Sequence, residues 1–303
     1  MLKPTKMTHA ILLFLIIFFA ITELLYLTVF SKTGEKKRHQ QEIQLLHETD
    51  ISNIDGIIIQ GNNQGIILQR TNDMWLLTDM SNPGSSIPAD TQRLAKLFVN
   101  LVSKHTMTKA GKKDSEIINT YGLDETNGTV ISIFKDGTEY QRLYFGSTDF
   151  SQARRYFTTL ELNSVFLFDS SFENYLTTNV QSWSDPYIIS QQLKDEVFQM
   201  GESQGVLREP QEPRDLSKLF ELRHGGIAES TLQTLEPELS FTIQMGDKST
   251  ISLEISQIIT SSDSAANEYA VKTTFDSPRL SKTFSYQTKI SLWTYNKIKE
   301  IML

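Results

Sequence analysis

One apolar stretch near the N-terminus constrains this chain more than any other feature. From Ala10 to Phe30 the sequence is almost continuously apolar and holds a single charged residue, Glu23. A helix of this length rises about 30 Å, which is the thickness of a hydrocarbon core. A secretory signal usually has a shorter apolar core, of about 7–15 residues, followed by a small-residue cleavage motif that this sequence lacks. We therefore predict a retained, single transmembrane helix over residues 10–30, after a short tail over residues 1–9.

Positive charges lie on both sides of this stretch. Two precede it and four follow it: Lys3 and Lys6, then Lys32, Lys36, Lys37 and Arg38. A count of positive charges alone would place the rest of the chain in the cytoplasm. Large domains cross a membrane largely regardless of such charges, so we expect the C-terminal part outside the cytoplasmic (inner) membrane.

Glu23 is unusual because a carboxylate inside the bilayer costs a few kcal/mol on insertion scales (about 2.5–3.5 at the helix centre for charged side chains). Two interpretations stay open. Glu23 could contact a neighbouring transmembrane helix, which is the common role of intramembrane ionisable residues. Alternatively, it is protonated or reaches the interface and has no function.

Composition excludes several functions. The chain has 303 residues, which predicts one or two folded units, and a formal net charge of −7, which disfavours nucleic acid as a partner. It has no cysteine, so disulfides, thiolate catalysis and cysteine-ligated metals are excluded. Only five histidines are available as metal ligands. We expect no cofactor and no metal.

After a polar segment over residues 31–49, in which Gln41 to His47 is helix-like, one pattern occurs twice. Residues 57–68 and 197–207 each indicate a hairpin whose turn is bounded by glycines. These glycines are Gly61 and Gly65 in the first copy and Gly201 and Gly205 in the second, at an offset of 140 (201−61 and 205−65). A helix follows in each copy, at residues 93–101 and 215–222.

The two copies continue in the same order. A second hairpin occupies residues 130–145 and 239–255, two strands follow at 155–158 and 165–168 and at 268–271 and 282–285, and helices at 172–176 and 292–301 close the copies. We predict an α+β fold in which the transmembrane helix precedes two repeated modules of antiparallel hairpins with packed helices. The modules are residues 50–180 and 192–303, joined by a linker over residues 181–191. Chance similarity of two α+β segments is the alternative.

Two motifs resemble catalytic signatures but fail on context. Gly201-Glu202-Ser203-Gln204-Gly205 matches the nucleophile elbow G-x-S-x-G, yet prolines follow where a helix is required, and no histidine follows His224. The first copy has no serine at this position, so a turn explains both copies. Gly246-Asp247-Lys248-Ser249 lacks the glycines of a phosphate loop. We expect no enzymatic activity.

Tyr121-Gly122-Leu123-Asp124 follows an amphipathic stretch and indicates a helix end, with Gly122 as the cap and Leu123 packing back. Together with several other features, this motif resembles the domain-of-unknown-function family 4340. The other features are Trp75, the helix start at Ile87 to Thr91, the hairpin ending Leu143 to Gly146, Arg155-Tyr156 and Val165-Phe166. The resemblance is good over about residues 51–190 and weak beyond.

The resemblance implies an N-terminal membrane anchor, an extracytoplasmic domain and an association with gliding-type ABC transporters beside a permease and an auxiliary subunit. It supplies no catalytic residues. We therefore predict a non-catalytic accessory or scaffold protein of an envelope transport complex, with the lipid bilayer and a membrane protein as partners. The alternative is an extracytoplasmic module that binds a glycan or peptide, which predicts an apolar cleft with converging polar groups between the two modules.

Overall fold

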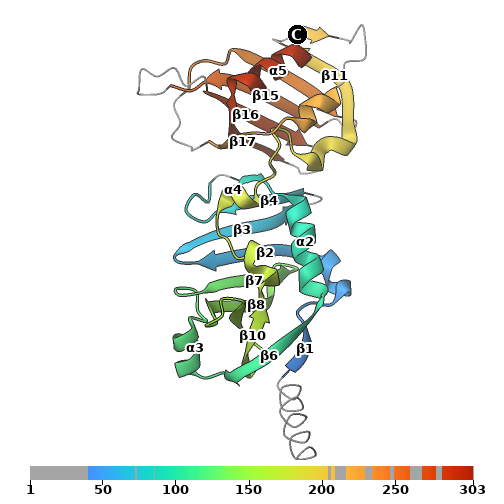
Figure 1. Ribbon diagram of the computed structural model, residues 1–303. Helices are drawn as coiled ribbons and strands as arrows, with labels where there is room; N and C mark the ends of the chain where they lie inside the picture. The colour runs from blue at the N-terminus through green and yellow to red at the C-terminus, as the bar shows by residue number, and fades with distance from the viewer. Residues whose placement is uncertain are drawn as a thin grey trace, which may run out of the picture.

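A computed structural model describes residues 40–71, 74–84, 86–203, 206–208, 216–228, 234–245, 249–259, 268–277 and 282–302. These residues form two antiparallel sheets that follow one another along the chain and lie one above the other (Figure 1). The predicted transmembrane helix over residues 10–30, with Glu23, lies outside the described residues. Among the described residues, no helix combines the length and the apolar character needed to cross a membrane.

The first sheet has ten strands in the order β1-β6-β10-β9-β8-β7-β2-β3-β4-β5. Their bounds are β1 Gln40–Gln44, β2 Ile54–Gly61, β3 Gln64–Thr71, β4 Met74–Asp79, β5 Ser86–Pro88, β6 Lys104–Lys112, β7 Thr129–Lys135, β8 Thr138–Thr148, β9 Arg154–Thr159 and β10 Ser164–Asp169. Helix α2 (Thr91–Val102) begins at Asp90, whose side chain accepts hydrogen bonds from the amides of Gln92 and Arg93. It buries Leu94, Leu97 and Leu101, which confirms the predicted helix.

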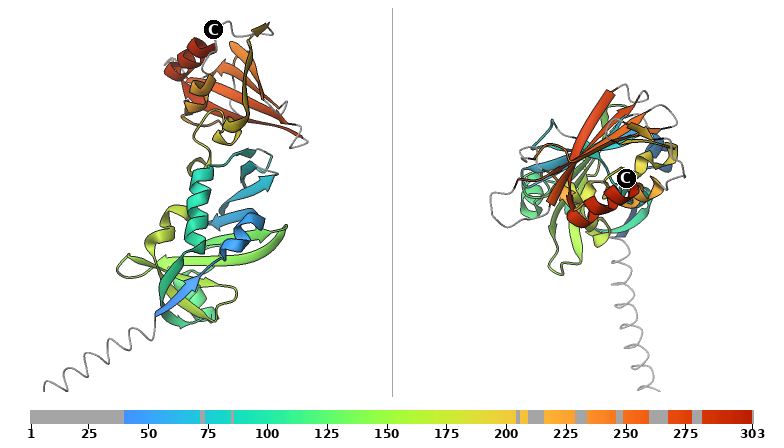
Figure 2. Two further views of the ribbon diagram at one scale, coloured as in Figure 1. Left: turned by 90° about the vertical axis from the view of Figure 1, so that its right-hand side faces the viewer. Right: turned by 90° about the horizontal axis from the view of Figure 1, so that it is seen from above.

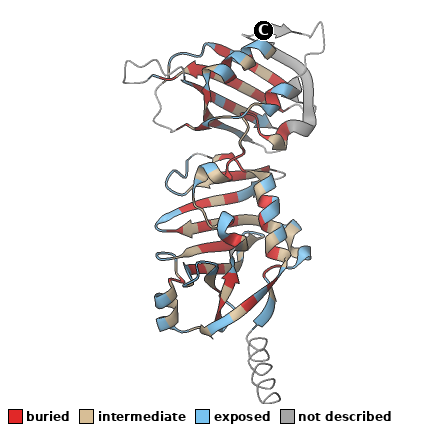
Figure 3. Cartoon of the chain, in the orientation of Figure 1, coloured by how far each residue is buried: buried red, intermediate tan, exposed pale blue. Residues whose placement is uncertain are grey.

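The second sheet has seven strands in the order β12-β11-β14-β15-β16-β17-β13. Their bounds are β11 Val197–Ser203, β12 Val206–Arg208, β13 Gly226–Ile227, β14 Leu239–Met245, β15 Thr250–Gln257, β16 Glu268–Ser277 and β17 Lys282–Ser291. Helix α5 (Leu292–Met302) packs on β16 and β17, with Tyr295 stacked on Tyr269 at 4.3 Å between ring centroids. Buried and exposed residues alternate along the strands, so each sheet has a core face (Figure 3).

The two sheets share a strand order. From β3 the first sheet runs β3-β2-β7-β8-β9-β10-β6, and from β12 the second runs β12-β11-β14-β15-β16-β17-β13. The strands at the seven positions also follow the same order along the chain. In the first half β6 precedes the β7–β8 hairpin and pairs with the last strand, β10. In the second half β13 precedes the β14–β15 hairpin and pairs with the last strand, β17. The first sheet adds β4 and β5 at one edge and β1 at the other.

The predicted fold class is wrong in its balance of helix and sheet. The remaining helices are short: α3 is Ser115–Tyr121 and α4 is Val180–Trp183. The helix expected at 215–222 is a 3-10 turn, η4 (Leu216–Glu221), as is the closing helix expected at 172–176, η2 (Ser170–Tyr175). The helix-like segment from Gln41 is an edge strand, β1, because it finds a partner in β6. Hydrogen bonding between strands distant in the chain therefore overrides the local helix propensity, and most of the described elements are strands.

The glycine alignment also needs correction. In the first hairpin Gly61 pairs with Gln64, so the turn consists of Asn62 and Asn63, with φ of 52° and 60°. Positive φ at both positions defines the turn type favoured in two-residue hairpins. In the second hairpin Ser203 pairs with Val206, so the equivalent offset is 142 (203−61) rather than 140. Gly201 pairs with Arg208 inside the strands, and Gly205 lies outside the described residues.

Candidate functional site

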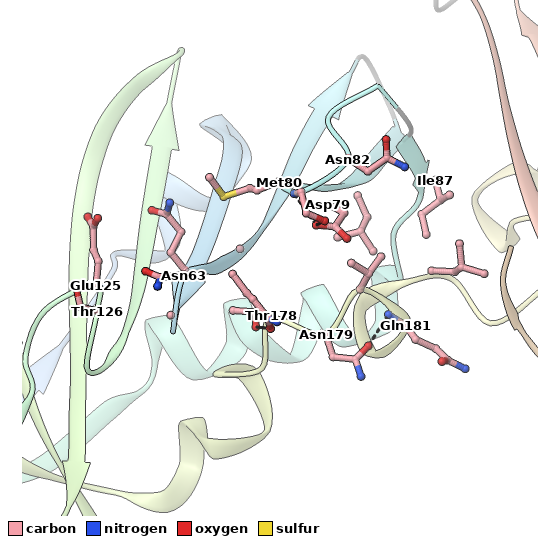
Figure 4. Close-up of a pocket in the computed structure, with 18 of the residues that line it drawn as sticks. Asn63, Asp79, Met80, Asn82, Ile87, Glu125, Thr126, Thr178, Asn179 and Gln181 are labelled. Atoms are coloured by element: carbon pink, nitrogen blue, oxygen red, sulfur yellow. Dashed lines mark hydrogen bonds between the residues drawn. The ribbon is translucent and has the colours of Figure 1, made fainter. Parts of the chain in front are cut away.

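A cleft of about 870 Å³ opens where the two sheets meet. Its lining comes from four parts of the first half and one of the second (Figure 4). The residues are Gln60, Gly61, Asn63, Gln64, Gly65, Leu77, Asp79, Met80, Ser81, Asn82, Ile87, Glu125, Thr126, Thr178, Asn179, Val180, Gln181, Ile227 and Ala228. Side-chain amides and hydroxyls predominate, and the two charged members are both carboxylates.

The tip of the β2–β3 hairpin forms one wall. Asn62 and Asn63 turn the chain, which leaves the side chain of Asn63 at the cleft (Figure 4). Gly65 lies directly beneath Met80, whose amide donates to the Gly65 carbonyl at 3.0 Å. A Cβ on Gly65 would lie 2.3 Å from the Met80 sulfur. A side chain on Gly65 would therefore have to displace the flexible Met80 side chain from the cleft.

Asp79 stands at the end of β4, in the middle of the cleft (Figure 4). Its Oδ1 atom accepts hydrogen bonds from the Ser81 amide at 2.8 Å and the Ser81 hydroxyl at 2.7 Å. The backbone carbonyl of Asp79 accepts from the Asn82 amide at 3.0 Å. Among the described residues nothing donates to the second carboxylate oxygen, Oδ2, so the turn holds a half-buried carboxylate with one oxygen available.

Glu125 lies on the opposite side, in the loop after α3. Helix α3 ends at Gly122, whose φ of 62° lies in the left-handed region, and Leu123 is 2 % exposed. Asp124 accepts from the amides of Thr126 and Asn127 at 2.8 and 2.9 Å. The Asn127 side chain, chiefly, lowers the pKa of Asp124. The Tyr121-to-Asp124 motif thus shapes the loop that carries Glu125, which itself contacts Arg142 at 3.3 Å.

The third wall joins both halves of the chain. Asn179 caps the short helix α4, and its Oδ1 accepts from the Gln181 amide at 2.9 Å. Ile227 of β13 and Ala228 come from the second sheet. The expected cleft between the modules therefore has a counterpart at the sheet junction, but its lining presents polar and apolar surface in similar amounts rather than being mainly apolar.

The junction beside the cleft is held by buried polar groups that the sequence analysis did not select. Asp185 is 6 % exposed, and its carboxylate accepts from the Ser190 hydroxyl at 2.7 Å and from the amides of Tyr187 and Gln191. Burial raises the pKa of Asp185. His224 Nε2 lies 2.8 Å from the Asp185 carbonyl, and burial lowers the pKa of His224. No local pattern marks these residues, because their partners are set by the chain's path between the sheets.

Other predicted site residues lie apart. Ser203, in the motif that resembles a nucleophile elbow, is the last residue of β11 and pairs with Val206 of the next strand, where an elbow needs a helix. Of the four hairpin glycines, Gly61 and Gly65 line the cleft and Gly201 does not. Within the described residues, no group of three or more histidines and carboxylates is arranged to hold a metal ion.

The fold and the cleft define a protein of two consecutive antiparallel sheets with equivalent strand order, which meet at a cleft of mixed polar and apolar lining. Residues 75–274 match the model of a family described as a domain of unknown function, DUF4340. The chain belongs to this family. The match begins in β4 and continues into β16, so it covers parts of both sheets rather than the first alone. No curated protein and no solved structure shows significant similarity to the chain.

Proposed function

We propose that this protein is a membrane-anchored, non-catalytic accessory or scaffold protein of an ABC-type, gliding-like transport complex in the bacterial envelope. The apolar sequence over residues 10–30 supports attachment to the cytoplasmic membrane. The family resemblance supports a transporter permease or auxiliary subunit as the partner. On this proposal the chain crosses the bilayer once, and its large C-terminal part lies on the extracytoplasmic side.

The observation that carries this proposal is the tight connection between the two sheets. Gln192, in the 3-10 helix η3 (Gln191–Glu196) after α4, accepts from the Trp75 amide at 2.8 Å and donates to the carbonyls of Trp75 and Ala89 at 3.0 and 3.1 Å. The Tyr286 hydroxyl of the second sheet donates to the Ile188 carbonyl at 2.8 Å.

The hydrophobic cores of the two sheets also interlock. Tyr286 of β17 belongs to the core cluster of the first sheet, whereas Met74 and Leu76 of β4 belong to the core cluster of the second. The views in Figure 2 agree that the two sheets meet end to end. A connection of this kind favours a body that moves as one unit, which is what a scaffold needs in order to hold a partner at a fixed distance from its anchor.

Co-purification from native membranes in mild detergent tests the proposal. Wild-type protein is expected to recover a polytopic permease and an ATPase. Glu23→Leu is expected to lose them if part of the contact lies inside the bilayer, whereas the neighbouring Thr22→Leu serves as the matched control. If the wild type recovers no membrane partner under conditions that retain known complexes, the accessory role is wrong.

A second candidate, an extracytoplasmic module that binds a glycan or peptide, is favoured by the cleft. Its volume of about 870 Å³ falls within the range of about 300–1,000 Å³ that is usual for ligand sites. It also lies where two parts of the fold meet, which is a common position for binding sites.

A further inference from the structure

The charges of the cleft restrict what it can bind. Asp79 and Glu125 are its charged lining side chains among the described residues. Glu125 is 52 % exposed and is already paired with Arg142. Asp79 is half-buried, is fixed through Oδ1 by Ser81, and keeps Oδ2 without a donor among the described residues. Asp79 is therefore the carboxylate that a bound cation would meet, since a charge-assisted hydrogen bond is strongest where the acceptor is held in place and partly shielded.

The uncharged lining has two chemical parts. Side-chain amides on the walls each offer two donors and an acceptor, and those of Gln60, Asn63 and Asn82 have no hydrogen bond to the described residues. The accessible apolar lining, which forms the aliphatic floor of the cleft, comes from Val180, Ile227 and Met80, the residue that follows Asp79, whereas Leu77 and Ile87 are 0 % and 6 % exposed. A polar wall next to an apolar floor matches an extended peptide, whose successive side chains point to opposite sides of its main chain.

A long basic side chain fits this combination in particular. Lysine and arginine lay an apolar stem along apolar surface and keep the charged group at a polar partner. On the aliphatic floor, that charged group would reach Asp79. A cationic sugar has no such stem.

We propose that the cleft binds a lysine- or arginine-containing peptide segment of a partner protein in an extended conformation. Its basic side chain lies along the aliphatic floor and pairs with Asp79, while the wall amides hydrogen-bond to its peptide groups. This inference rests on the second candidate function, a ligand-binding module, and names its ligand class.

The test uses the full-length protein in nanodiscs, immobilised and exposed to a randomised library of N-acetylated hexapeptides, with the retained peptides sequenced by mass spectrometry. Asp79→Asn removes the charge, and Asn82→Trp, at an exposed turn position, obstructs the cleft without a change of charge. Glu42→Gln, on β1 at the other edge of the first sheet, is the matched charge control. Circular dichroism checks that each variant folds. A glucosamine tetramer is the glycan probe.

Lysine or arginine should be enriched about tenfold over glutamine at one or more positions, as expected for one charge-assisted hydrogen bond. Asp79→Asn and Asn82→Trp should abolish this enrichment, and Glu42→Gln should keep it. Enrichment that survives Asp79→Asn would reflect the net negative charge and overturn the inference. Retention of the glucosamine tetramer without any peptide would overturn the peptide class and leave the binding module standing. Retention of neither would overturn both.

Discussion

Gln192 offers the sharpest test of how the two sheets are joined. Gln192→Met keeps the length of the side chain but removes its three hydrogen bonds, to the Trp75 amide and to the carbonyls of Trp75 and Ala89. The Trp75 carbonyl keeps a second donor, the Ala89 amide at 2.9 Å, so the main losses fall on the Trp75 amide and the Ala89 carbonyl. At about 1 kcal/mol per lost bond, and somewhat more for a buried group left without a partner, we expect a destabilisation of about 3 kcal/mol.

Urea unfolding of the full-length protein, followed by tryptophan fluorescence, measures this effect. With a denaturant dependence of about 2 kcal/mol per molar urea, a loss of 3 kcal/mol lowers the midpoint by about 1.5 M. Gln41→Met, at an exposed glutamine of β1, is the matched control. Equal midpoints for Gln192→Met and Gln41→Met would refute the reasoning, because they would show that the bridge contributes nothing to stability.

Two further predictions concern packing and pH. Gly146→Ala should lower the free energy of unfolding by about 2 kcal/mol or more, since its Cβ would lie 2.1 Å from the Tyr121 carbonyl oxygen, whereas Gly84→Ala, with open space around it, should change little in the same urea titration. Burial lowers the pKa of His224 from 6.5, and its buried Nδ1 has no hydrogen-bond partner among the described residues, so the unfolded chain binds a proton more readily. Stability should therefore fall as pH drops below 6.5 towards the folded pKa, and His224→Gln should lack this component of the pH profile; equal profiles would contradict the assignment.

Local features of this fold were predictable because they depend on a few neighbouring residues. Asp136-Gly137 forms the turn of the hairpin that was expected over residues 130–145, with φ of 52° and 71°. Gly122 adopts the left-handed conformation that ends a helix, and Asp90 begins α2. Hydrophobic alternation and turn residues placed the two hairpins and the two later strands of each half in order, but they did not predict β1, β4, β5, β6 or β13.

The cleft was not predictable in the same way. Asp79 and Asn82 lie in an ordinary turn, whereas Glu125 comes from a loop and Gln181 from the short helix α4, both far away in the chain. No spacing in the sequence brings these three segments together, because their meeting depends on how α4 and β13 pack against the end of the first sheet.

The sequence by itself determined the turns, the helix ends, the strand-rich halves and the apolar stretch over residues 10–30, because each depends on backbone conformation or on side-chain polarity over a short window. Only the tertiary structure decided that Gln40–Gln44 is a strand, since its hydrogen bonds are supplied by β6, more than fifty residues away. It also decided that the two glycine pairs are not equivalent, because strand register is fixed by pairing across the sheet. The tertiary structure likewise decided the junction at Gln192, because the hydrogen-bond partners of Gln192 lie about one hundred positions earlier in the chain.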